Sequence, residues 1–188
     1  LSTNGNVDVE ISNGIINANN SRLTNLPAPA ANSDAAPKLY VDNLTPAIAF
    51  SAYRTASDVF SVTTARKALF NLTAYNVGGY FNTSLARFLP LTSTPRKYLL
   101  TCRVNILAPA ATGQMFCEIW KNGTALHRGN VENLQAPASG YTTVGGTWFV
   151  ELNGTTDYVE IYVTGAMAGN KSPVANALEY YFQGAEYR

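Results

Sequence analysis

The chain has 188 residues, of which 46% are hydrophobic and 13% are charged, and its formal net charge is +1. This length suffices for one domain of ordinary size and an appendage. The near-zero charge and the lack of any apolar run of about 20 residues argue against nucleic-acid binding and membrane insertion. Low charge without high hydrophobicity indicates a β-rich, extracellular or virion-type protein.

Residues 1–26 are polar and rich in Asn, with a weak alternation of apolar residues at Val7, Val9 and Ile11. Such a segment cannot bury enough apolar surface on its own to offset the entropy lost on ordering. Two interpretations stay open: a flexible linker, or a fibrous stem in which several copies wrap around a common axis. The β-forming run from Val7 to Ile11 favours the stem.

Residues 23–44 read LTNLPAPAANSDAAPKLYVDNL. Ser33 or Asp34 can cap a short helix with Pro37 in its first turn, where the missing N–H does no harm. The segment resembles a linker found in the tail fibres of tailed phages, although that linker usually has Thr in place of Pro37. The resemblance rests on Leu23, Asn25, Leu26, Pro27, Pro29, Ser33, Asp34, Ala35, Ala36, Lys38, Tyr40, Val41 and Asp42.

Residues 66–122 contain several strand-like runs separated by turn residues, with no room for a helix between them. Apolar side chains alternate along two of these runs, at Tyr98, Leu100, Cys102, Val104 and Ile106 and again at Met115, Cys117 and Ile119. This period of two is typical of half-buried strands. The centre of the chain is therefore predicted to be an antiparallel β-meander or sandwich.

Cys102 and Cys117 lie on successive predicted strands, and pairing these strands through a loop near Pro109 places the two roughly opposite one another. Adjacent strands rarely offer the geometry that a disulfide needs. Two buried thiols are therefore favoured over a cross-strand disulfide, which stays the alternative. Zinc binding is not expected, because CxxC spacing is absent.

Two further strands are predicted around Asn153-Gly154, which is the strongest short hairpin signal in the chain. Val159, Ile161 and Val163 face one way on the second of them. The last run, LEYYFQGAEYR, carries aromatic residues on both sides. One side of such a strand must meet something outside its own sandwich.

Residues 45–188 resemble the globular head of complement C1q and the tumour-necrosis-factor (TNF) relatives. The matching segments occur in the expected order, at residues 48–52, 70–82, 88–100, 119–123, 152–159 and 181–185. Departures are a missing Gly near residues 94–96 and two residues inserted before Asp157. The resemblance implies an all-β, ten-stranded jelly-roll head of residues 45–188, assembled as a homotrimer. Residues 1–44 are predicted to be the fibre stem and linker with its short helix. The aromatic surplus assigned to the trimer interface is Tyr180, Tyr181, Phe182 and Tyr187.

Catalytic chemistry is not expected. His127 is the only histidine, and the sequence contains no G-x-S-x-G or H-E-x-x-H motif and no metal-ligand spacing. Asp157 and Glu160 are the nearest candidates for a carboxylate pair, but both fall where the resemblance places structural turn residues. We therefore expect a non-enzyme without cofactor or metal.

Exposed loops are the remaining candidates for function. With strands of alternating direction, the loops near residues 92–96, 128–141 and 165–176 are expected at the end far from the stem. Asn, Gln, Tyr and Lys side chains there can hydrogen-bond to or stack on a glycan or a surface protein. The alternative is that these are merely solvated loops. The candidate receptor-binding residues are Asn130, Asn133, Gln135, Tyr141, Asn170 and Lys171.

These observations favour a virion component: a bacteriophage fibre tip that is a homotrimeric, receptor-binding adhesin for a bacterial surface glycan or protein. Because the chain begins at Leu1 rather than Met, we expect a preceding part that attaches to other virion proteins. One alternative is a structural capsid-head fibre or decoration protein whose head drives trimerisation. Another is a secreted C1q-like ligand, which the lack of Gly-X-Y repeats and the phage-like linker disfavour.

Overall fold

The computed structural model describes residues 2–3, 6–7, 10–12, 15–17, 28–30, 48–56, 64–108, 112–134, 140–165, 172–173 and 176–187. The chain divides into two compact units, Leu1–Thr45 and Pro46–Arg188. In the first, β1 (Ser2–Thr3) pairs with β2 (Asn6–Val7), and β3 (Glu10–Ser12) pairs with β4 (Ile15–Asn17). The predicted short helix at Ser33 or Asp34 lies outside the described residues.

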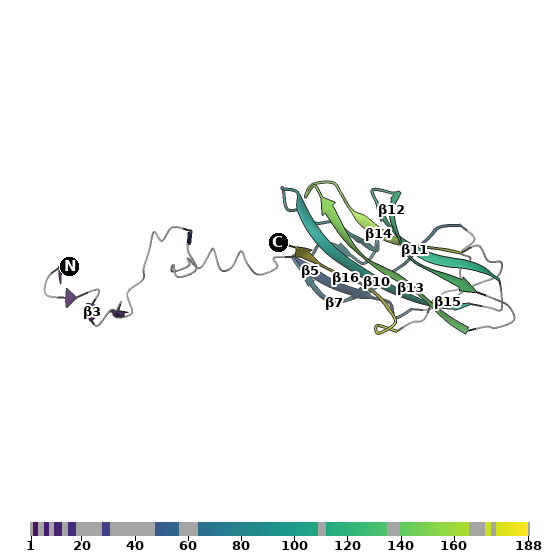
Figure 1. The fold of residues 1–188 in the computed structure, drawn as a ribbon, viewed down its shortest axis with the longest axis horizontal. Coiled ribbons are helices and arrows are strands. Elements are labelled where there is room, and N and C mark those ends of the chain that lie inside the picture. Colours follow the sequence, from purple (N-terminus) through teal and green to yellow (C-terminus); the bar gives the residue numbers. More distant parts are fainter. Residues whose placement is uncertain are drawn as a thin grey trace. The chain divides into compact units, whose positions relative to one another are not determined.

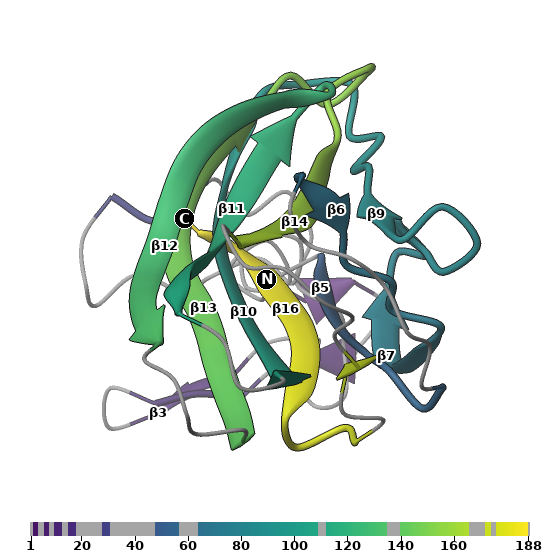
Figure 2. The same ribbon diagram turned by 90° about the vertical axis from the view of Figure 1, so that its right-hand side faces the viewer.

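The second unit consists of two antiparallel sheets packed face to face (Figures 1 and 2), and no helix occurs within the ranges given above. Sheet I has the order β13 (Gly140–Leu152), β10 (Arg96–Ala108), β16 (Tyr180–Tyr187), β5 (Ala49–Tyr53) and β7 (Leu72–Val77), with β15 (Ser172–Pro173) also beside β10. Sheet II has the order β12 (Thr124–Leu134), β11 (Gly113–Lys121), β14 (Val159–Gly165), β9 (Arg87–Phe88) and β8 (Phe81–Asn82), with β6 (Arg66–Lys67) beside β14.

The core lies between the sheets and is built by strand alternation. Every second side chain is buried from Tyr98 to Ile106 in β10 and from Met115 to Ile119 in β11, as the period of two predicts. Near the middle, Phe50 contacts three other aromatic rings, with centroid distances of 4.6 Å to Phe88 and 5.0 Å to both Phe81 and Phe182. Burying one such side chain contributes roughly 1.5–3 kcal/mol. These contacts join the two sheets into one packed sandwich.

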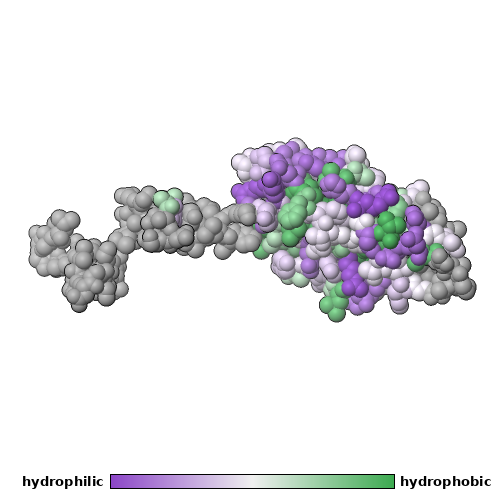
Figure 3. All heavy atoms as spheres, in the orientation of Figure 1, coloured by the Kyte–Doolittle hydropathy of each residue, from purple (hydrophilic) through white to green (hydrophobic). Residues whose placement is uncertain are grey.

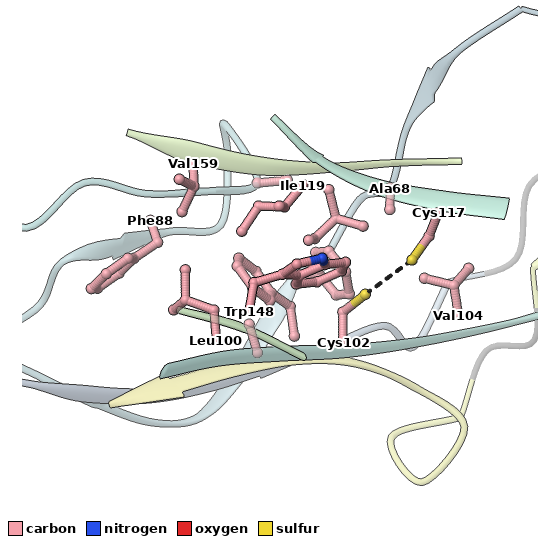
Figure 4. Close-up of a cluster of buried hydrophobic side chains, with 14 of the residues drawn as sticks. Ala68, Phe88, Leu100, Cys102, Val104, Cys117, Ile119, Trp148 and Val159 are labelled. Atoms are coloured by element: carbon pink, nitrogen blue, oxygen red, sulfur yellow. Dashed lines mark hydrogen bonds between the residues drawn. The ribbon is translucent and has the colours of Figure 1, made fainter. Parts of the chain in front are cut away.

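The two cysteines are free thiols, as favoured from the sequence, but their strands are not neighbours. β10 pairs with β13 and β16 in sheet I, whereas β11 pairs with β12 and β14 in sheet II. The prediction that these strands pair through the loop near Pro109 was therefore wrong. Cys102 and Cys117 face each other across the core instead (Figure 4), with their sulfur atoms 3.7 Å apart.

The prediction of a hairpin at Asn153-Gly154 was also wrong. β13 belongs to sheet I and β14 to sheet II, so the segment between them crosses from one sheet to the other. The Asn153 side-chain oxygen accepts hydrogen bonds from the backbone N–H groups of residues 155, 156 and 157, at 2.9, 3.0 and 3.0 Å. Asn therefore shapes a local Asx-type turn here rather than a hairpin reversal.

A two-residue hairpin is present at the other Asn-Gly pair. Lys121 is paired with Thr124 across β11 and β12, and both turn residues have positive φ, 52° at Asn122 and 79° at Gly123. These signs suit a type I′ turn, which matches the twist of two antiparallel strands.

Strand register defines two ends of the sandwich. At the end that we call the base, Ala49 is opposite Ala185, and Lys97 is opposite both Tyr187 and Glu151. The last residues of β10, β12 and β14 and the first of β11, β13 and β16 lie at the other end, the tip. The segment 92–96 immediately precedes Lys97 and thus lies at the base, which corrects its predicted position at the far end.

Candidate binding surfaces

The outer face of sheet I is mainly uncharged and carries exposed apolar side chains. Phe149 of β13, Leu99 of β10, Ala185 of β16 and Ala49 of β5 are successive register partners in one row across the sheet. Phe149 is 61% exposed and Tyr187 is 57% exposed, although their rings contact each other edge to face at 5.2 Å. We call Tyr75, Leu99, Phe149, Ala185 and Tyr187 the apolar face.

Two hollows are present on this side of the sandwich. The larger, with a volume of about 430 Å³, is lined by Lys97, Phe149, Val150, Glu151 and Tyr187. The smaller, of about 390 Å³, is lined by Tyr75, Leu99, Thr101, Thr147, Gln183, Gly184 and Ala185. Both are therefore bordered by members of the apolar face. Figure 3 shows hydrophobic residues gathered in patches among hydrophilic ones on the surface of the head.

The outer face of sheet II is different, because its charges and aromatic rings are paired with one another. Arg128 donates a hydrogen bond to Glu118 at 3.0 Å and lies over the Phe116 ring at 3.8 Å. Trp120 donates to Glu118 at 3.3 Å and stacks on Tyr162 with centroids 4.0 Å apart. The chain of contacts, which we call the polar ladder, consists of Phe116, Arg128, Glu118, Trp120, Tyr162, Glu160 and Lys67.

The polar ladder ends at the ion pair between Glu160 and Lys67. This carboxylate accepts hydrogen bonds from Lys67 at 2.5 Å and from the Tyr162 hydroxyl at 3.4 Å. Burial, together with the neighbouring Glu160 charge, raises the pKa of Tyr162, so the phenol stays a neutral donor. The polar side chains of this face thus satisfy one another within the head.

The predicted receptor-binding residues have different environments. Asn130 links the edge strands β12 and β13, which lie side by side (Figure 2). Its side-chain oxygen accepts a hydrogen bond from the Gly145 N–H at 2.5 Å, and its amide donates to Glu132 at 2.7 Å. Asn130 therefore connects the two sheets, and its side-chain amide is engaged in contacts within the head.

Asn133 and Tyr141 both lie near the tip. Asn133 accepts a hydrogen bond from the exposed Gln114 amide at 3.1 Å, and Tyr141 is 70% exposed. Tyr141 is the register partner of Leu107, which is also exposed. Leu107 was not predicted as a site residue. Its place in the alternation of β10, in the set opposite to Tyr98 and Ile106, already indicated an outward-facing apolar side chain. Gln135, Asn170 and Lys171 lie outside the described residues.

The predicted interface residues divide by strand alternation. Tyr180 and Phe182 are fully buried within the head's own core, where Phe182 packs against Phe50 at 5.0 Å. They cannot contact another copy, and their assignment to the interface is corrected. Tyr181 and Tyr187 are on the opposite side of β16, on the outer face of sheet I. Only these two remain candidates for contacts between copies.

The predicted carboxylate candidates are held in structural contacts. Burial alone would raise the pKa of Asp157, but hydrogen bonds from Lys121, Asn122 and the Asn153 backbone outweigh it and hold the pKa below its usual range. An ionised carboxylate that is tied in this way is poorly suited to donating a proton. Across the part of the chain that the structure describes, no three His, Cys, Asp or Glu side chains gather in a way that could hold a metal ion.

The part of the chain that the structure describes contains no helix with the length and apolar character needed to cross a membrane. No family model matches the sequence, and no curated protein shows significant similarity to it. Similarity does appear among solved structures. Murine APRIL matches with 9% identity and a TM-score of 0.53, over 74% of this chain and 98% of APRIL. Eiger TNF from S. frugiperda matches with 11% identity and a TM-score of 0.50, over 76% of this chain and 94% of the other.

The head is a jelly-roll sandwich. The globular domain of zebrafish complement 1qA also aligns, with 15% identity and a TM-score of 0.49 over 75% of this chain and 98% of that domain. At these identities the likeness concerns the fold alone. The matches to APRIL and Eiger TNF confirm the all-β jelly-roll prediction, and the functional assignment rests on the surfaces described above.

Proposed function

We propose that the protein is the homotrimeric head of a phage fibre, which adheres to a receptor on a bacterial surface. The observation that carries this proposal is the contrast between the two outer faces of the sandwich. Sheet II presents side chains that are already paired, whereas sheet I presents exposed aromatic and aliphatic groups around two hollows. Clustered apolar groups on an exposed face mark a contact surface.

A second and a third copy of the chain are the partners that suit the apolar face. Its members occupy register-matched positions on a continuous sheet, so a copy can pack along the whole row. Lys97 and Glu151 are opposite each other at the base, where they can form the polar rim of such an interface. A closed threefold arrangement would cover the apolar face on every copy and leave no apolar surface open to further association. The TNF-like fold and the C1q-like sequence pattern support three copies over two.

The tip is proposed as the receptor-binding end. Tyr141 and Leu107 expose a flat aromatic ring next to an aliphatic side chain there. Such a pair can stack on a sugar or on an apolar part of a surface protein. We propose that residues 1–44 form the stem and linker and residues 45–188 the head, on the strength of the phage-like pattern in residues 23–44. Other virion proteins would be the partners that hold the fibre on the particle.

The proposal is tested by measuring binding of the purified trimer to a panel of intact bacteria. Tyr141→Ala is compared with Leu126→Ala, which truncates an exposed side chain of β12 near the base. We expect saturable binding to some strains that Tyr141→Ala weakens at least tenfold and that Leu126→Ala leaves unchanged. A trimer that binds no bacterium would instead favour the structural reading, a capsid-head fibre or decoration protein.

A further inference from the structure

The only two cysteines of the chain lie side by side in the core. Cys102 projects from β10 of sheet I and Cys117 from β11 of sheet II, and both are buried. Their sulfur atoms are 3.7 Å apart and lie among apolar side chains (Figure 4). A disulfide has a sulfur–sulfur distance of about 2.05 Å, so bonding requires the sulfurs to approach by less than ~2 Å.

Cys117 lies where the strand pairing of sheet II is irregular. The pairing of β11 with β12 shifts register here, because Phe116 is opposite Val131 whereas Glu118 is opposite Arg128. Cys117 therefore lies opposite a bulge that Gly129 and Asn130 form in β12. On β12, Gly129 lies beside it, and a Cβ added at Gly129 would be only 2.8 Å from the Cys117 sulfur. A bulge bends the strand that carries it and interrupts the regular pairing of the two strands. Because Gly129 has no side chain, the Cys117 sulfur packs against the backbone of β12 there and is not interlocked with a side chain at that position.

We propose that Cys102 and Cys117 are a latent disulfide between the sheets, which forms when the protein meets a small-molecule disulfide as oxidant. One protein thiolate attacks the oxidant, forms a mixed disulfide and releases one thiol. The second protein thiol loses its proton and attacks the mixed disulfide, which releases the other thiol. The two protein sulfurs lose two electrons in total, and these reduce the oxidant disulfide to two thiols.

Burial controls when this reaction runs. Burial, and the neighbouring Cys117 thiol, raise the pKa of Cys102 well above its ordinary value, so little reactive thiolate exists in the closed head. The oxidant must therefore reach the thiols while the sheets are separated, during folding or a large opening. A reducing cytoplasm keeps such a pair as thiols, whereas an extracellular medium allows the bond. The head would accordingly become more stable after it leaves the cell.

The bond would join residues that are 15 positions apart in the chain. For a loop of that size in a domain of this length, the loss of entropy in the unfolded chain corresponds to a rise in melting temperature of roughly 6 to 12 °C. Because the link also ties sheet I to sheet II, it acts on global unfolding rather than on a local segment.

The test is to refold the full chain from denaturant in a buffer of reduced and oxidised glutathione, and in parallel in excess dithiothreitol. The glutathione sample is expected to lose the mass of about two hydrogen atoms, to yield a Cys102–Cys117 linked peptide, and to melt at a higher temperature. Added dithiothreitol should reverse all three changes. Cys102→Ala and Cys117→Ala serve as controls, since neither can form the bond.

Three results would overturn the proposal. They are thiols that remain free after refolding with glutathione, glutathione adducts on both cysteines in place of the internal bond, and a bonded head that melts below the reduced one. The peptide map and the intact mass separate these outcomes without reference to trimer formation or binding. Failure of the proposed function would leave this test unaffected.

Discussion

Truncation of Phe149 to Ala is the most direct perturbation of the apolar face. The residue is 61% exposed in the single head, and an aromatic side chain presents about 200 Å², so about 120 Å² is available for burial by another copy. At about 25 cal/mol per Å², this area corresponds to about 3 kcal/mol per copy, or about 9 kcal/mol for three equivalent copies. The protein concentration at which half of the chains are trimeric varies as the square root of the trimer's dissociation constant. This concentration should therefore rise by up to about a thousandfold.

The assay is sedimentation velocity over a wide concentration series, with the melting temperature of the dissociated chain as a folding control. Since Phe149 faces outward, the variant should dissociate while its head stays folded. A charge-based pair of variants adds a matched comparison, because Leu99 on the apolar face and Leu126 on β12 are equally exposed at 39%. The trimer of the Leu99→Asp variant should dissociate, and that of the Leu126→Asp variant should not. Trimers of Phe149→Ala that persist at the lowest concentrations, or equal dissociation of both Asp variants, would refute the assignment of this face.

Three other predictions concern the head itself. Phe182→Ala should destabilise it by about 3–5 kcal/mol, since the side chain is fully buried; an unchanged denaturation midpoint would contradict the core assignment. Asn130→Ala should lower the free energy of unfolding by about 1–2 kcal/mol, because it removes the hydrogen bond to the Gly145 N–H, and should leave binding to bacteria unchanged. Weaker binding by a folded variant would instead indicate that Asn130 contacts the receptor. Asp157, whose pKa is lowered by its partners, stabilises the head above its unfolded-state pKa of about 4 and loses this contribution as pH falls through the lower folded-state value. The melting-temperature gap between wild type and Asp157→Asn should therefore shrink on acidification, and a constant gap would argue against the lowered pKa.

The proposed interface and the proposed receptor-binding end occupy different parts of sheet I. Phe149 and Tyr187 lie toward the base, where the chain enters the head at Ala49, whereas Tyr141 lies toward the tip. Variants of Phe149 and Tyr141 should thus separate assembly from adhesion. A loss of binding in Tyr141→Ala without dissociation would be the clearest sign of this division.

Local patterns in the sequence were sufficient to locate most strands and their inward sides. Alternation along residues 96–108 and 113–121 depends only on backbone geometry, so Tyr98, Leu100 and Ile119 could be assigned to the core in advance. The same pattern could not resolve β16, because aromatic residues occur on both of its sides. Burial of Phe182 and exposure of Tyr187 were decided by which side met the opposite sheet.

The assignment of strands to sheets was decided only by the tertiary structure. β10 and β11 are consecutive in the chain, yet they lie in opposite sheets, because pairing depends on contacts between residues far apart in sequence. For this reason the two thiols face each other across the core, and Asn153-Gly154 connects one sheet to the other. A local sequence pattern could show neither of these two facts. The contacts of Asn130 with β13 and the pairing within the polar ladder likewise appear only once distant strands are brought together. The sequence alone was sufficient to predict an all-β jelly roll and most of its inward-facing side chains. The packing of the two sheets decided which faces remain available for partners.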